Sequence, residues 1–346
     1  MRKLLTILLI VLSIPVCVNA SEYTPPTAPP DAEQYMPQET NQFGEGLLYV
    51  LKSAINDVFP EISEVSKQCG IVLILIIILS VFHIVTDQKW HIVQLIGVVC
   101  IGSTLIGSSQ ILMQLGMKTS SDIVDYSTLL LPVMTSALAA QGGVTTSAAL
   151  YSGTIIFTTI IMKLITKFIV PLVYAFIAVS LAGNAFNEKN ILKIKESING
   201  IITWILKIAL YIFTGYITIT GVLSGTIDAS ALKATKLTIS GTVPVIGGIL
   251  ADASESVLLS AGIMKNSVGV YGIIAIFAIC IGPFLKIGIQ YCFLKFTSIL
   301  SGVIAADNFN SLISDFSTAM GFILAMTGTV CLMQLISIGC FMKGIA

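Results

Sequence analysis

The chain has 346 residues, of which 55% are hydrophobic and only 10% are charged, and its mean hydropathy is +0.95. An ordinary soluble domain carries roughly 25% charged residues. The composition therefore excludes a soluble globular protein and predicts an all-α, polytopic integral membrane protein. Lysine plus arginine (18) equals aspartate plus glutamate (18), so the chain has no excess of basic residues that would indicate nucleic-acid binding.

The same composition argues against an enzyme. The seven cysteines form no CxxC pair, and two histidines are too few for a zinc centre or a histidine-based triad. The sequence contains no phosphate-binding loop and no nucleophile elbow. We therefore expect no catalytic residues, no metal site and no cofactor.

The N-terminus has the pattern of a targeting segment. Arg2 and Lys3 precede an apolar stretch over 4–16, and small residues occupy 18–20. This pattern predicts a secretory signal peptide over 1–20 that is cut before Ser21, and an uncleaved anchor is the alternative.

A proline-rich segment and an amphipathic segment come next. Residues 21–45 are rich in Pro, Glu, Gln and Thr, which predicts a disordered linker on the outer side of the membrane. Residues 46–69 show apolar side chains at helical spacing, with Pro60 expected to end the helix. That helix either lies on the membrane surface or binds a partner.

The remaining chain contains about seven to eight apolar segments of spanning length. The first two spans occupy 70–112. The candidate spans are 70–86, 92–112, 147–163, 167–186, 200–223, 267–285, 287–304 and 319–341. Pro283 and Lys286 either divide two of these helices or lie inside one kinked helix. Two further apolar stretches, 123–141 and 239–250, are interrupted by Pro, Gly and Ser and predict broken or re-entrant helices.

An internal repeat connects the two interrupted stretches. LPVMTSALA at 131–139 resembles VPVIGGILA at 243–251, and the same offset of 112 residues places Pro171 on Pro283. AGNAFN at 182–187 resembles AADNFN at 305–310. The repeats are expected over 120–223 and 232–341. If each interrupted stretch re-enters the membrane the repeats are inverted, and if each spans fully they are parallel.

The interrupted stretches supply the candidate pore or interface residues. Glycines allow close backbone approach, and Asp252 and Glu255 lie on one helical face. These positions either line a pore or form an interfacial helix-turn-helix with solvated carboxylates. The candidates are Pro132, Pro244, Gly247, Gly248, Asp252 and Glu255.

Three lysines lie within or beside apolar helices: Lys207, Lys286 and Lys295. A charge at the bilayer centre costs at least about 2.5 kcal/mol. Each lysine therefore either extends its ammonium group to the membrane surface or faces the bundle, a pore or another subunit.

The quoted segments resemble one known family. The run SGTVPVIGGILADASESVLLSAGIMKNSVG at 240–269 and the run LLLPVMTSALAAQGG at 129–143 are similar to characteristic stretches of the stage III sporulation protein AE family of endospore-forming bacteria. The signal peptide and the proline-rich tail fit the same family, and the resemblance covers about 45–343.

The resemblance implies a non-enzymatic subunit of a channel or secretion complex that links mother cell and forespore. It places the chain in the mother-cell membrane that engulfs the forespore. Its implied partners are other stage III sporulation A proteins, including a cytoplasmic ATPase and intermembrane ring proteins, and indirectly a forespore membrane partner called Q. The alternatives are a stand-alone secondary transporter, suggested by the duplicated broken helices, and a non-conducting assembly scaffold.

The targeting segment yields the first testable prediction. N-terminal sequencing of protein extracted from membranes should begin at Ser21, because the small residues at 18–20 fit a cleavage site. Recovery of a chain that begins at Met1 would show an uncleaved anchor.

Overall fold

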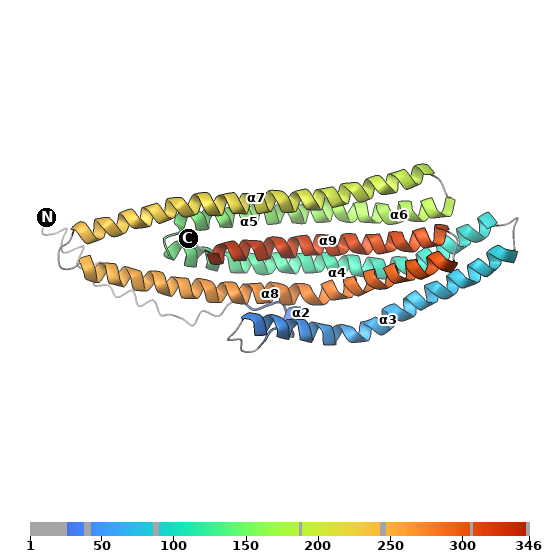
Figure 1. Cartoon of the computed structure of the whole chain (residues 1–346), viewed down its shortest axis with the longest axis horizontal. Helices are drawn as coiled ribbons and strands as arrows, with labels where there is room; N and C mark the ends of the chain where they lie inside the picture. Colours follow the sequence, from blue (N-terminus) through green and yellow to red (C-terminus); the bar gives the residue numbers. More distant parts are fainter. Residues whose placement is uncertain are drawn as a thin grey trace.

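The computed structural model describes residues 26–37, 43–85, 90–186, 189–242, 247–304 and 307–343, and this part of the chain is almost entirely helical (Figure 1). A short helix α2 (Pro30–Glu33) precedes a bundle of long helices. These are α3 (Phe43–Val85), α4 (Trp90–Ala140), α5 (Val144–Leu164), the π-helix η1 (Ile165–Ile169), α6 (Val170–Phe186), α7 (Lys189–Thr242), α8 (Gly247–Ile304) and α9 (Asp307–Lys343). The signal-peptide prediction lies outside the described residues.

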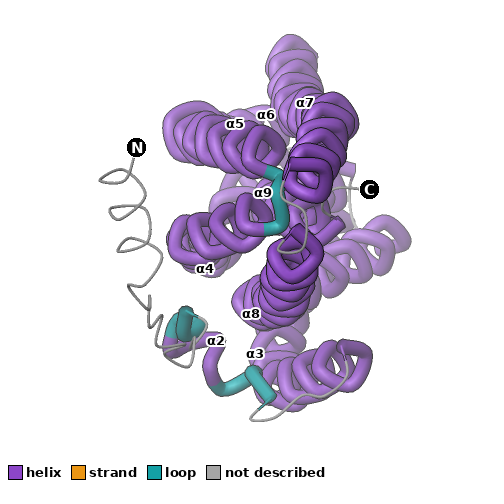
Figure 2. The backbone as a smooth tube through the Cα atoms, turned by 90° about the vertical axis from the view of Figure 1, so that its left-hand side faces the viewer, coloured by secondary structure: helices purple, strands orange, loops and turns teal. Residues whose placement is uncertain are grey.

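Six of these helical stretches are long and apolar enough to cross a membrane, which confirms the all-α polytopic class. In Figure 1 successive long helices run in opposite directions along one bundle. Figure 2 shows α9 at the centre, surrounded by α4, α5, α6, α7 and α8, while α3 lies at the edge beside α8. The core is a continuous cluster of apolar side chains, because lipid-facing helices must bury their remaining surface against one another.

The turn between α4 and α5 follows from two glycines in the sequence AAQGG. Gly142 has a φ of 93°, a left-handed conformation that glycine adopts without steric cost. The N–H of Gly143 donates to the carbonyl of Leu138 at 3.1 Å, and that of Gly142 donates to Ala139 at 2.9 Å. These two bonds satisfy carbonyls that the end of α4 leaves free, so the helix stops at Ala140 and the chain reverses.

Several expected interruptions lie inside continuous helices. Pro60 does not end its helix, because α3 runs through it from Phe43 to Val85. The stretch 123–141, expected to be broken or re-entrant, is the second half of α4, and Pro132 lies exposed within it. An interior proline costs about 3 kcal/mol. The packing of α4 against α8 and α9 offsets that cost.

Two pairs of expected spans are also joined. Segments 147–163 and 167–186 form one helical stretch, in which the π-helix η1 connects α5 to α6. Segments 267–285 and 287–304 both belong to α8, so Pro283 and Lys286 lie inside one helix. Of the second interrupted stretch, 239–242 ends α7 and 247–250 begins α8, and 243–246 lies outside the described residues.

The matched segments of the internal repeat do not all run in the same direction. Pro171 lies in α6 and Pro283 lies in α8, and both helices point the same way in Figure 1. The helices that follow them, α7 and α9, both run back. By contrast, 131–139 lie in α4 and the matched residues 247–251 begin α8, and these two helices run in opposite directions (Figure 1). Whether the repeats are inverted or parallel therefore stays a prediction. The matched segments 131–139 and 243–251 also differ in local structure. Pro132 lies inside α4, whereas α7 ends before Pro244 and α8 begins after it.

The amphipathic segment 46–69 is the first half of α3 and packs on the bundle. Val50, Ala54 and Val58 are buried at a spacing of four residues, which forms one helical stripe against the core. Leu48 and Phe59 are 67% and 62% exposed on other faces of the helix. This half of α3 is therefore an integral part of the bundle that also presents apolar side chains outward.

Polar side chains join the helices inside the bundle. Thr154 of α5 and Ser337 of α9 share a hydrogen bond of 2.7 Å, and Gln334 Nε2 donates to Thr158 Oγ1 at 2.8 Å. Gln68 of α3 donates to Ser108 of α4 at 2.8 Å. Such bonds fix the register of neighbouring apolar helices, because an unpaired polar group in an apolar interior is unfavourable.

Candidate functional site

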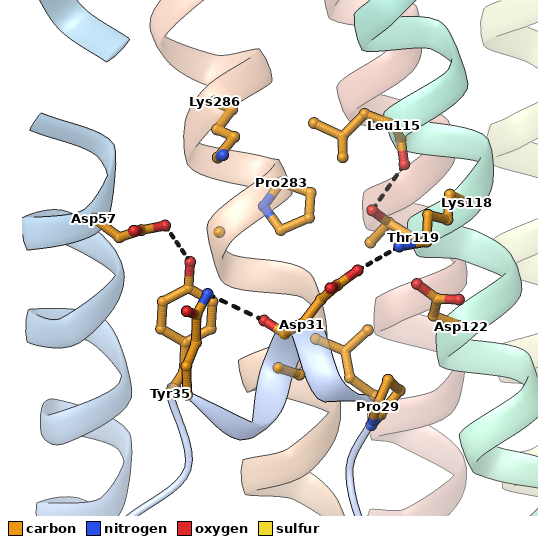
Figure 3. A pocket seen from close by; sticks show the side chains of 14 residues that line it. Pro29, Asp31, Tyr35, Asp57, Leu115, Lys118, Thr119, Asp122, Pro283 and Lys286 are labelled. Carbon is orange, nitrogen blue, oxygen red and sulfur yellow. Dashed lines mark hydrogen bonds and ion pairs between the residues drawn. The ribbon is translucent and has the colours of Figure 1, made fainter. Parts of the chain in front are cut away.

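The N-terminal segment 26–37 docks on the bundle between α3, α4 and α8 (Figure 3). We call it the docked segment. Its helix α2 starts with Pro30 at a position where the missing N–H costs nothing. The N–H groups of Ala32 and Glu33 donate to the carbonyl of Pro29 at 2.8 and 3.0 Å, which forms the single helical turn.

Burial of small and aromatic side chains holds the docked segment in place. Ala32 is 2% exposed and Tyr35 is 4% exposed, and both belong to the main apolar cluster. Gly282 of α8 provides the space for Tyr35, because a Cβ at position 282 would lie 3.0 Å from the Tyr35 hydroxyl. The structure therefore differs from the disordered linker expected over 21–45: residues 26–37 are packed against the bundle.

Three polar contacts surround the docked segment. The Tyr35 hydroxyl donates to Asp57 Oδ2 of α3 at 2.6 Å, and Lys118 of α4 pairs with Asp31 (Figure 3). Lys286 Nζ of α8 lies 2.5 Å from Glu61 Oε1 of α3. Burial and the neighbouring Asp57 carboxylate raise the pKa of the Tyr35 phenol well above its usual value, so it remains a neutral donor at physiological pH.

A cavity of about 230 Å³ lies beneath the docked segment. Its charged lining consists of Asp31, Asp57, Lys118, Asp122 and Lys286. It is smaller than the roughly 300–1,000 Å³ that is typical of small-molecule sites. Neither His nor Cys lines it, and no group of three or more His, Cys, Asp or Glu within the described ranges could hold a metal ion. The arrangement is thus suited to holding a segment of chain between three helices.

A second polar cluster lies between α6, α7 and α9. Lys195 Nζ of α7 lies 3.0 Å from both carboxylate oxygens of Asp315 of α9, and Asn184 Nδ2 of α6 donates to Asp315 Oδ2 at 3.0 Å. Gln94 Nε2 of α4 donates to the Asn184 carbonyl at 2.9 Å. The Asp315 and Lys195 side chains are 10% and 15% exposed, so their charges are paired away from solvent. Removing one partner of such a pair costs about 3–5 kcal/mol.

The predicted site residues do not converge on one place among the described residues. Lys286 lines the cavity of Figure 3, whereas Pro132, Lys207 and Lys295 are exposed on α4, α7 and α8. Four of the others fall in the first turns of α8, in a part where only the backbone is described: Gly247, Gly248, Asp252 and Glu255. Pro244 lies outside the described residues. Whether these positions form a pore remains a prediction.

Sequence reasoning missed the residues that hold the docked segment and the buried ion pair. Tyr35 and Asp57 are 22 positions apart, and Lys195 and Asp315 are 120 apart. No local pattern links such pairs, because helix packing alone brings them together. The one available signal was the presence of Lys195 and Asp315 beside strongly apolar segments, where a charge needs a partner.

Comparison with known proteins now identifies the family. Residues 31–344, which begin within the docked segment and include every long helix, match the stage III sporulation protein AE family. The chain belongs to this family. The match extends over the whole bundle, so the family assignment applies to the described fold as a unit.

A curated relative supports the assignment. The stage III sporulation protein AE of Bacillus subtilis (strain 168) is 20% identical to the chain over 246 residues, which cover 68% of this chain. The matched region spans 61% of the length of that relative. No solved structure matches the chain.

The docked segment yields the second prediction. Tyr35→Ala should expose 26–37 to protease at least about tenfold more readily, since burial of such a side chain contributes roughly 1.5–3 kcal/mol. Lys118→Ala should change the rate much less, because the Lys118–Asp31 pair is more than half exposed. Limited proteolysis of the purified protein in detergent, followed through an N-terminal tag, measures both rates.

Tyr49→Ala is the matched control, because Tyr49 is 51% exposed on α3. Equal cleavage rates for Tyr35→Ala, Tyr49→Ala and the unmodified chain would contradict the docking of this segment.

Proposed function

We propose that the chain is a non-enzymatic membrane subunit of a sporulation channel or secretion complex that links mother cell and forespore and supports late forespore development. Membership of the stage III sporulation protein AE family is the observation that carries this proposal. In this account the chain enters the mother-cell membrane through a signal peptide over 1–20. Its partners are other stage III sporulation A proteins, including a cytoplasmic ATPase and intermembrane ring proteins, and indirectly the forespore protein Q.

The dimensions of the bundle support a role in a larger assembly. A helix rises 1.5 Å per residue, so the 58 residues of α8 extend about 87 Å, whereas bilayer hydrocarbon is about 30 Å thick. Much of the bundle must therefore lie outside the hydrocarbon, where it is available to proteins on either side. Apolar side chains such as Leu48 and Phe59 on the first half of α3 are exposed for such contacts.

A stand-alone transporter is a weaker proposal. Transporters of the inverted-repeat class bind substrate where broken helices meet near the membrane midplane. Here the first expected break is continuous helix, because α4 runs through Pro132 to Ala140. The charged cavity of Figure 3 is small and is covered by the chain's own N-terminal segment.

Purification of the tagged full-length chain from sporulating cells tests the proposal. We expect it to be recovered in mild detergent with an ATPase and small membrane proteins, in a particle much larger than the 36.8 kDa monomer. A tagged, unrelated polytopic protein from the same membrane is the control. Recovery of the chain alone, together with ion-coupled substrate flux into liposomes that contain only this chain, would overturn the proposal in favour of a transporter.

A further inference from the structure

A groove of about 520 Å³ opens between α7 and α8, with α9 as its floor. Thr203, Lys207 and Leu210 of α7 line one wall, and Phe284 and Tyr291 of α8 line the other. The floor contains the small residues Gly321, Ala325 and Gly328, which lie among the apolar side chains of Phe322, Leu324 and Leu332. Figure 2 shows α9 at the centre of the bundle between α7 and α8.

The small residues of the floor leave room that the chain's own packing does not require. A Cβ at Gly321 would lie 3.5 Å from Tyr291, and one at Gly328 would lie 3.6 Å from Phe284, which are ordinary van der Waals contacts. Elsewhere the bundle does require glycine, because a Cβ at Gly153 would lie 2.0 Å from the Tyr216 ring. Ala325 is exposed between the two floor glycines. The floor thus allows the close approach of a backbone from outside this chain.

Lys207 gives the groove a charge. It lies within the candidate span Lys193–Thr220, is exposed, and forms no ion pair with any other described residue. By contrast, Lys286 pairs with Glu61 and Lys195 pairs with Asp315. A lysine ammonium group within an apolar span is unfavourable unless it reaches water or an acidic partner. An occupant of the groove that carries a carboxylate would supply that partner.

We propose that this groove binds a transmembrane helix of a partner protein, and that the helix carries an aspartate or glutamate at the depth of Lys207. The proposal depends on the proposed function, since it assigns a contact surface to the subunit. A lipid acyl chain fits the observations less well, because it carries no acidic group that could pair with Lys207 inside the groove. Two packed helices gain close backbone contact along such a floor and pair their opposite charges across it.

Photo-crosslinking in sporulating cells tests the groove. The full-length chain carries a benzophenone amino acid in place of Ala325, and cross-linked peptides are identified by mass spectrometry. We expect an adduct with an apolar segment of another protein that contains Asp or Glu. Lys207→Glu should lower the adduct yield at least tenfold, because it places like charges opposite each other, and Lys207→Arg should retain most of the yield.

Matched variants separate the groove from general damage. Ala325→Leu fills the floor and should reduce co-purification of the cross-linked protein. Ala148→Leu, at an exposed position on α5, should leave co-purification unchanged. Lys295→Glu, on an exposed face of α8, is the charge control for Lys207→Glu. Immunoblots of membrane fractions confirm that each variant is present at the level of the unmodified chain.

Four results would overturn the groove proposal: no adduct, an adduct only with lipid, an adduct only with a second copy of this chain, or an adduct whose yield Lys207→Glu leaves unchanged. In each of these cases, continued recovery of the chain in a large complex would leave the proposed function standing. Recovery of the chain as a free monomer would count against both.

Discussion

The thickness of the bilayer is the constraint on which the rest of this structure depends. Backbone groups within lipid must be hydrogen-bonded inside their own segment, so the spanning parts must be helices. The helices are nevertheless far longer than about 30 Å of hydrocarbon requires. Their excess length brings polar and charged residues into the bundle, and those residues need partners. The Asp315–Lys195 pair is one of the resulting contacts.

Hydropathy predicted the class of fold but not the continuity of its helices. Apolar windows locate segments that tolerate lipid, and six described helices contain such windows. A lysine pair such as Lys163 and Lys167, or a proline such as Pro132, interrupts a window without interrupting the helix. Continuity depends on the packing of neighbouring helices, which supports a helix through an unfavourable residue. That information is absent from a window of about 20 residues.

Composition likewise did not predict that the docked segment is ordered. Its prolines and acidic residues predict disorder on average, yet Ala32 and Tyr35 are buried in the main apolar cluster. The burial of Ala32 and of Tyr35 beside Gly282 places 26–37 on the bundle. The cost of a charge in an apolar helix singled out Lys207, Lys286 and Lys295 in the sequence, but it did not decide between water and a protein partner for each of them. The structure shows Lys286 paired with α3 and Lys207 exposed in a groove.

The central claim is that α6 and α8, which carry the matched Pro171 and Pro283, cross the membrane in the same direction (Figure 1). A cysteine-free full-length chain with single cysteines at Asn190, Asn308, Gln141 or Lys343 tests it through labelling with a membrane-impermeant maleimide. Asn190 and Asn308 begin α7 and α9, while Gln141 and Lys343 lie at the opposite end of the bundle (Figure 1). The account predicts that Asn190→Cys and Asn308→Cys react from one side of the membrane, and Gln141→Cys and Lys343→Cys from the other. Reaction of Asn190→Cys and Asn308→Cys from opposite sides would contradict it.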